Sequence, residues 1–175
     1  MKDIIIVCGL NGSGKSTFAR ALADRIQYIY KDIEDYYFPN RCYNEYYSEP
    51  KSRDQVSAAM LKDLCCYEKM VIAAVKADYS NEISEMFTKA IYIQTPKNIR
   101  LKRVKERSFK IFGSRMQEGG DLYERETAFF DFVEKRSDSL VEDWLLHLSV
   151  PVYVIDGTRP VDENIEYILG SFISQ

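Results

Sequence analysis

The segment Gly9 to Ser16 contains the residue types with the most specific chemistry in this chain. It has a glycine, four further residues and then Gly-Lys-Ser, which is the phosphate-loop pattern. Glycines permit positive φ angles, so that consecutive backbone N–H groups can curl around a polyphosphate. Lysine at this position reaches the β- and γ-phosphates, and the serine hydroxyl binds Mg²⁺. We therefore expect a nucleoside triphosphate and Mg²⁺ to be bound, the latter by Ser16, with contacts from Gly9, Asn11, Gly12, Ser13, Gly14, Lys15, Ser16 and Thr17.

The flanks of this loop have the composition that the chemistry requires. An apolar run, Ile4 to Val7, comes directly before it, and a segment of helical character, Thr17 to Ile26, follows. A strand would deliver the loop to a sheet edge, and a helix would point its N-terminal N–H groups and dipole at the bound anion. A glycine-rich turn that only links strand to helix is the alternative, but it would leave Lys15 unexplained.

The positions of further apolar runs predict how the loop is supported. Strands are expected at 4–7, 28–31, 70–74, 90–93 and 152–155, and helices at 17–26, 52–67, 82–88, 96–113, 121–148 and 162–172. Alternating strands and helices predict an α/β fold with three αβα layers and a five-stranded, mostly parallel sheet. Ligands of such sheets bind beyond the carboxyl ends of the strands, so the functional residues should follow strands.

Polar residues do follow the expected strands. After the second strand come Asp32, Glu34 and Asp35, any of which could orient an acceptor hydroxyl or take its proton. We favour Asp35 for this catalytic role and Asp32 as a magnesium ligand through water, with a solvated turn as the alternative. The acceptor itself is expected against Asp35, Tyr36, Tyr37 and Lys76, within an acceptor arm at about 36–67.

The basic helix that begins near Pro96 should cover the same edge of the sheet. Arginines are spread over a helical lid at about 103–125, in which Gly113 and Gly119-Gly120 supply hinge-like freedom. Arginines stabilise a migrating phosphoryl group, and we expect catalytic roles for Arg107 and Arg115. A solvated helix face is the expectation for Arg100 and Lys102.

Composition excludes several other classes of protein. The 175 residues are expected to form a single domain, 1–175, and the formal net charge of −3 makes nucleic acid an unlikely partner. No apolar run approaches the length that crosses a bilayer, so no membrane partner is expected. The four cysteines fit neither a disulfide framework nor a zinc site, and the cytoplasm is the expected location.

These motifs together resemble those of the small P-loop kinases of the adenylate kinase and nucleoside or nucleotide kinase group. The resemblance covers the phosphate loop, the acidic end of the second strand, the arginine-bearing lid and the late turn Asp-Gly-Thr-Arg-Pro at 156–160. It implies an ATP- and Mg²⁺-dependent kinase that moves the γ-phosphoryl group to a small-molecule or nucleotide acceptor. It also implies that Gly157, Thr158 and Pro160 flank the adenine, and that Arg103, Arg107 and Arg115 clamp phosphates.

The third strand departs from that family pattern, because Val71 to Asp78 lacks the Asp-Gly-Phe-Pro-Arg segment that often ends it. The departure argues against adenylate kinase itself. Two other classes remain as alternatives: an ATP- or GTP-binding regulatory module that hydrolyses its nucleotide slowly, and a kinase of nucleic-acid ends. The first predicts nucleotide binding without dependence on an acceptor, and the second predicts salt-dependent oligonucleotide binding.

Overall fold

A five-stranded sheet forms the centre of the protein. The computed structural model describes residues 2–39 and 50–173. The strands are β1 (Asp3–Cys8), β2 (Ile29–Asp32), β3 (Lys69–Ala74), β4 (Lys89–Gln94) and β5 (Val152–Asp156). They lie in the order β2-β3-β1-β4-β5, and every neighbouring pair is parallel. The predicted α/β class and five-stranded sheet are confirmed, with all strands parallel.

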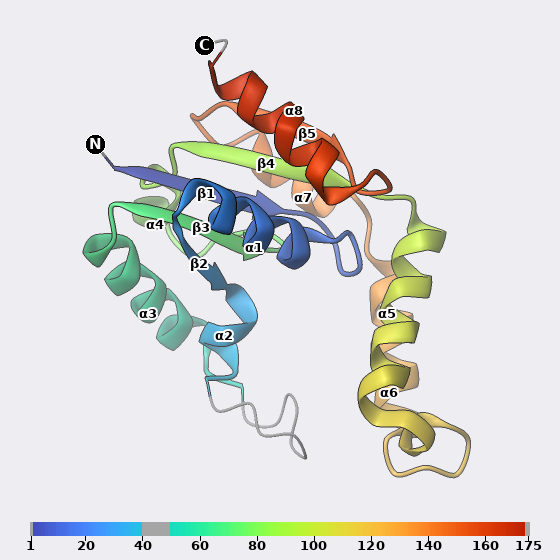
Figure 1. Ribbon diagram of the computed structural model, residues 1–175. Coiled ribbons are helices and arrows are strands. Elements are labelled where there is room, and N and C mark those ends of the chain that lie inside the picture. The colour runs from blue at the N-terminus through green and yellow to red at the C-terminus, as the bar shows by residue number, and fades with distance from the viewer. Residues whose placement is uncertain (1, 40–49, 174–175) are drawn as a thin grey trace.

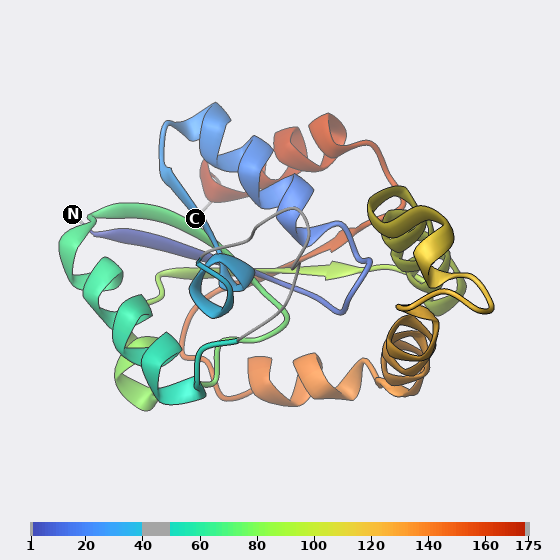
Figure 2. The same ribbon diagram turned by 90° about the horizontal axis from the view of Figure 1, so that it is seen from below.

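Strand β1 is buried on both faces because helices cover the sheet from both sides. Its side chains alternate, so that Ile4 and Ile6 pack into one apolar cluster and Ile5 and Val7 into the other. Helices α1 (Lys15–Ile26) and α8 (Val161–Ile173) cover one face. Helices α3 (Arg53–Cys66), α4 (Asn81–Glu85) and α7 (Ser139–Leu145) cover the other face (Figures 1 and 2).

Two helical features stand beyond the carboxyl ends of the strands. One is the short helix α2 (Ile33–Tyr37), which directly follows β2. The other is formed by α5 (Lys97–Phe112), the 3₁₀ turn η1 (Gly113–Met116) and α6 (Tyr123–Lys135), which we call the hairpin. Figure 1 shows α2 and the hairpin on opposite sides of the space below the sheet, and in Figure 2 α5 and α6 lie side by side. The expected acceptor arm begins within α2, and its residues 40–49 lie outside the described part of the chain.

The single helix expected over 121–148 is wrong. The chain leaves the helical conformation at Arg136, which has φ −68° and ψ 126°, and helix α7 begins only at Ser139. The sequence contains no glycine or proline at this break. At this break the Arg136 guanidinium donates a hydrogen bond of 2.6 Å to Asn11 Oδ1 in the phosphate loop. This is a tertiary contact, which the sequence could not show.

The expected solvated position is also wrong for Arg100, although it is correct for Lys102. Arg100 is only 2% exposed, and its Nε donates to the Thr95 carbonyl oxygen at 2.9 Å. Its Nη2 lies 3.4 Å from Asp138 Oδ1. Arg100 is buried because this part of α5 packs against the phosphate loop: a Cβ added to Gly12 would lie 2.3 Å from the Arg100 carbonyl oxygen.

Candidate functional site

The phosphate loop connects β1 to α1 through backbone conformations that only glycine adopts freely. Gly12 and Gly14 have φ angles of 80° and 98°. Gly14 is the N-cap residue of α1, and no side chain caps the N–H groups of the first turn of this helix. These N–H groups and the helix dipole therefore favour an anion in front of Lys15.

The loop is held in place from the ends of β4 and β5. Thr95 donates its hydroxyl to the Ser13 carbonyl oxygen at 3.0 Å. Gly157 packs on the other side, where an added Cβ would lie 2.6 Å from the same Ser13 oxygen and 2.1 Å from Thr95 Oγ1. The Ser13 Oγ is buried and has no hydrogen-bond partner in residues 2–39 and 50–173. The conformation of the loop is therefore coupled to the turn after β5.

Lys15 is buried beside two acids and two further cations. Lys15 is only 8% exposed, and burial lowers the pKa of its amine below the ordinary value of 10.5. Asp32 and Glu34 oppose this lowering of the pKa, whereas Arg107 and Arg136 add to it. The surroundings of Lys15 thus disfavour its charge until an anion is present.

Two arginines brace the loop. Arg103 donates from Nη1 and Nη2 to the Gly157 carbonyl oxygen, both at 3.1 Å, so it links α5 to the turn after β5. Arg136 holds Asn11, as described above, and its half-buried guanidinium lies 4.6 Å from the ring centre of Phe132. Burial lowers the pKa of Arg136. Sequence analysis missed Arg136, because the helix break that places it has no local signal.

Three hollows adjoin one another along the carboxyl edge of the sheet. The first, the β5 hollow of about 200 Å³, lies over Ser13, Gly157, Arg159 and Asn164. The second, the loop hollow of about 170 Å³, contains Lys15 and Ser16 and shares Gly14, Thr17 and Arg103 with the first. The third shares Arg107 with the loop hollow. Together they form one path from the turn after β5, across the phosphate loop, to α2.

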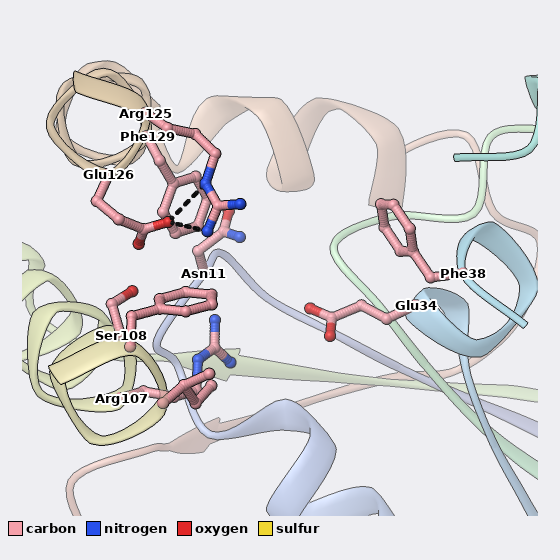
Figure 3. A pocket seen from close by; sticks show the side chains of 10 residues that line it. Asn11, Glu34, Phe38, Arg107, Ser108, Arg125, Glu126 and Phe129 are labelled. Carbon is pink, nitrogen blue, oxygen red and sulfur yellow. Dashed lines mark hydrogen bonds and ion pairs between the residues drawn. The ribbon is translucent and has the colours of Figure 1, made fainter. Parts of the chain in front are cut away.

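We call the third hollow the hairpin cavity. Its volume is about 330 Å³, and it lies between α2 and the two helices of the hairpin (Figure 3). Arg107 and Asn11 lie at its inner end, next to the phosphate loop, and Glu34 extends from α2 toward them. The lining residues are Asn11, Glu34, Phe38, Arg107, Ser108, Ile111, Phe112, Arg125, Glu126 and Phe129.

The residues expected to hold an acceptor lie outside this cavity lining. Tyr36 is buried and donates its hydroxyl to Asp63 at 2.8 Å, and Tyr37 accepts from the Tyr79 hydroxyl at 3.1 Å. Lys76 forms an ion pair of 2.7 Å with Asp78, while Asp35 is exposed on α2. Glu34 of α2 and Phe38, which follows directly after this helix, line the cavity instead. A helix expected at 33–38 would have revealed this pair.

Arg115 and Arg107 are placed differently. Arg115 lies at the tip of the hairpin, paired with Asp121 at 2.6 Å, and it lines none of the three hollows. Arg107 lines both the loop hollow and the hairpin cavity, and no ion pair of its guanidinium is found within the described residues. The structure thus brings Arg107, but not Arg115, to Lys15.

The remaining expected site residues lie near the loop. Asp32 caps α2: its Oδ1 accepts from the Glu34 N–H at 3.0 Å and its Oδ2 from the Tyr30 hydroxyl at 2.9 Å. Thr158 donates from N and Oγ1 to Asp156 Oδ1 at 2.8 and 2.6 Å, and these bonds lower the pKa of Asp156. Pro160 precedes α8 and accepts from the Asn164 N–H at 3.2 Å.

Within residues 2–39 and 50–173, no group of three or more histidine, cysteine, aspartate or glutamate side chains is arranged to hold a metal ion. A metal at the loop would therefore depend on a hydroxyl, water and phosphate oxygens in addition to one carboxylate. In the same part of the chain, no helix has the length and apolar character needed to span a bilayer.

Comparison with known proteins identifies the family of this chain. Residues 5–122, more than half of the chain, match the AAA_18 family, which is described as an AAA domain, and the chain belongs to this family. A relative from Bacillus subtilis (strain 168), the uncharacterized protein YqaC, is 27% identical over 177 residues, covering 97% of each chain.

Solved structures of small kinases have the same fold. Shikimate kinase from Bacteroides thetaiotaomicron aligns with a TM-score of 0.65 at 15% identity, covering 99% of both chains. Deoxyadenosine kinase from M. mycoides aligns at 0.57 and 15% identity, over 98% of this chain and 100% of the other. A gluconokinase from Sinorhizobium meliloti aligns at 0.54 and 17% identity, over 94% and 87%. The predicted resemblance to small P-loop kinases is confirmed at the level of the fold.

Proposed function

We propose that this protein is a kinase that transfers the γ-phosphoryl group of ATP, with Mg²⁺, to a hydroxyl group of a small acceptor. One observation carries the proposal: three adjoining hollows follow one another along the carboxyl edge of the sheet, with Lys15 in the middle one and Arg107 shared by the middle one and the hairpin cavity. A donor base, a triphosphate and an acceptor need three such sites in this order. The fold shared with small kinases supports the same function.

The donor is proposed to occupy the first two hollows. Gly157, Thr158 and Pro160 would flank the base, and the N–H groups of the loop from Gly9 to Thr17 would surround the phosphates. Lys15 would meet the β- and γ-phosphates, where its charge is favoured again by the anion. The excess of cations around the loop, where Arg103, Arg107 and Arg136 surround Lys15, fits an anion of high charge.

The residues present fit a magnesium ion. Ser16 lines the loop hollow, and the carboxylate of Asp32, whose charge acts on the neighbouring Lys15, is fixed by two hydrogen bonds. Hydroxyl, water and carboxylate oxygens are the ligands that Mg²⁺ prefers. Ser16 would hold the ion directly and Asp32 through water. The bound ion would neutralise charge on the phosphates.

The transfer step requires an acceptor hydroxyl in line with the γ-phosphorus. The new bond joins the acceptor oxygen to the γ-phosphorus, and the bond to the β,γ-bridging oxygen breaks, leaving ADP. The hydroxyl proton passes to a carboxylate of α2. Asp35 was our expectation from sequence. However, Glu34 lines the hairpin cavity, and its charge opposes the lowering of the Lys15 pKa, so we assign this role to Glu34. Arg107 would stabilise the charge of the migrating group.

A coupled assay of ADP release tests this function. Purified protein is incubated with Mg²⁺-ATP and a panel of nucleosides, nucleotides, sugars and hydroxy acids. We expect at least one acceptor to stimulate ADP release, and Lys15→Met to abolish the stimulation. Tight binding of ATP without stimulation by any acceptor would contradict the proposal and favour a regulatory module. Salt-dependent binding of an oligonucleotide, with phosphate found at its end, would instead identify a nucleic-acid kinase. We propose that the protein acts in the cytoplasm, where ATP is available.

A further inference from the structure

The hairpin cavity has walls suited to a flat ring. Phe38 lies on the α2 side and Phe112 and Phe129 on the hairpin side, with Ile111 beside Phe112. Aromatic faces favour stacked or edge-to-face contact with another ring. The volume of about 330 Å³ lies near the lower end of the roughly 300–1,000 Å³ typical of small-molecule pockets. The cavity thus fits one compact molecule with an aromatic part.

A charged pair on α6 supplies polar groups in this wall. Glu126 is only 4% exposed, and its Oε1 accepts from Arg125 Nε at 3.1 Å and from Nη2 at 2.9 Å. The Arg125 guanidinium lies 4.7 Å from the ring centre of Phe112. Figure 3 shows this pair at the cavity, opposite Glu34 and Phe38.

Part of this pair is free to meet a ligand. Across residues 2–39 and 50–173, Glu126 Oε2 and Arg125 Nη1 form no hydrogen bond or ion pair. The pair therefore offers one hydrogen-bond acceptor and one donor at separate points of the cavity wall. A heterocycle that carries both donors and acceptors, as nucleobases do, has groups that match the two atoms. A simple hydrocarbon ring would offer neither of these atoms a hydrogen bond.

The charge of the cavity wall argues against an anionic acceptor. Its lining contains two arginines, Arg107 and Arg125, and two glutamates, Glu34 and Glu126. These charges balance, and the charge of Arg125 is already compensated by Glu126. Arg107 adjoins the phosphate loop, where we assign it to the migrating phosphoryl group. Among the described residues that line the cavity, no cation remains for a carboxylate or a phosphate on the acceptor.

From these contacts we infer that the phosphoryl acceptor is a neutral, nucleoside-like heterocyclic alcohol. Its ring lies between Phe38 and the hairpin phenylalanines, its hydrogen-bonding edge meets Arg125 and Glu126, and its hydroxyl points to Glu34 and the phosphate loop. This inference rests on the proposed kinase function and specifies its substrate class. Glu126 is then a specificity-determining residue, although it lies on the far side of the cavity from Lys15.

The first experiment compares acceptor classes in the ADP-release assay. The acceptors are four ribonucleosides and four deoxyribonucleosides, their 5′-monophosphates, shikimate and gluconate, and the product is identified by mass spectrometry. We expect kcat/KM for the best nucleoside to exceed that for any of the anionic acceptors by at least about tenfold. A higher value for shikimate, gluconate or a nucleotide would overturn the inference while leaving the kinase function intact.

The second experiment asks whether Glu126 contacts the ring edge. It compares adenosine or cytidine, whichever reacts faster, with the same nucleoside lacking its exocyclic amino group. In the unchanged protein, loss of the amino group should lower kcat/KM by at least about tenfold. In Glu126→Gln this ratio should shrink toward one, because the charged acceptor of the amino group is gone. An unchanged ratio would refute the contact.

Aromatic variants and a binding measurement complete the test. Phe129→Leu should raise KM for the nucleoside, whereas Phe109→Leu, at a 53% exposed position on the same hairpin outside the cavity, should leave it unchanged. Equal effects of the two variants would count against the cavity. If no acceptor releases ADP, nucleoside binding is measured calorimetrically. If the unchanged protein binds a nucleoside and Phe129→Leu does not, the nucleoside-like ligand is supported and the kinase function is rejected. If the unchanged protein binds no nucleoside, both the ligand class and the kinase function are rejected.

Discussion

Replacing Lys15 by methionine should stabilise the free protein and weaken its response to nucleotide. Methionine keeps the unbranched apolar stem but has no charge to bury. Burial lowers the pKa of Lys15 from its ordinary value of 10.5. The folded state therefore binds this proton less tightly than the unfolded state. The resulting destabilisation is full below the lowered pKa and is relieved as pH rises from there to 10.5.

The size of the effect follows from this linkage. Each unit by which the pKa is lowered corresponds to about 1.4 kcal/mol. For a domain of this size, 1 kcal/mol shifts Tm by about 2–4 °C, so each unit is worth about 3–6 °C. At neutral pH, Lys15→Met should thus melt a few degrees above the unchanged protein. The difference should narrow as pH approaches 10.5.

Nucleotide should stabilise the unchanged protein more than the variant. With Mg²⁺-ATP at one hundred times Kd, the unchanged protein gains about 2.7 kcal/mol. Loss of a charged hydrogen bond worth about 1.5–3 kcal/mol would leave Lys15→Met with only about 0.3–1.3 kcal/mol at the same concentration. The unchanged protein should therefore gain about 5–11 °C and the variant less than about 5 °C.

Differential scanning fluorimetry from pH 6 to 10, with and without Mg²⁺-ATP, measures both effects. Lys102→Met is the matched control, because the Lys102 side chain is 76% exposed on α5. It should change neither Tm nor the response to nucleotide appreciably. A Lys15→Met protein that melts below the unchanged protein, yet is stabilised equally by ATP, would refute this account of Lys15.

Four other substitutions give three further predictions. Gly157→Ala places a Cβ 2.6 Å from the Ser13 carbonyl oxygen, so calorimetry should show ATP binding weakened by about tenfold or more; unchanged affinity would disprove the coupling of turn and loop. Arg100→Met should lower the free energy of unfolding in urea by about 1.5–3 kcal/mol, because it leaves a buried carbonyl unpaired; a loss under about 0.5 kcal/mol would contradict this. Arg107→Met should lower kcat by about 10²-fold or more, while Arg115→Met should lower it by less than about tenfold; equal losses would place both at the transferred group.

The fold and the phosphate loop were predictable because their physical requirements are local. Buried parallel strands need continuous apolar runs, as in Ile4 to Val7, and the loop needs glycine at positions such as Gly12 and Gly14. The prediction for Arg100 failed because charge alone gives no sign of burial. Its position depends on how closely α5 approaches the loop, which is a tertiary property.

The cavity was less predictable for two separate reasons. No helix was expected directly after Asp32, so the position of Glu34 and Phe38 at one wall of the cavity was not recognised. Phe129 lies in the helix expected over 121–148, whose apolar spacing is typical of core packing, yet it lines the cavity because α6 packs beside α5 instead of against the sheet. Helical periodicity identifies an apolar face, but it does not identify what that face meets.

The close contact between Gly12 and the Arg100 carbonyl has a mechanical consequence for the hairpin. Helix α5 is fixed to the phosphate loop at one end, and its 16 residues extend about 24 Å from there. A tilt of only about 3° at the fixed end would displace the opposite end by about 1 Å, a misplacement that can change a reaction rate by about 10²-fold. A small displacement at Gly12 is therefore amplified at the end of α5 that leads to α6. A substitution of Gly12 would alter acceptor selectivity without touching the acceptor.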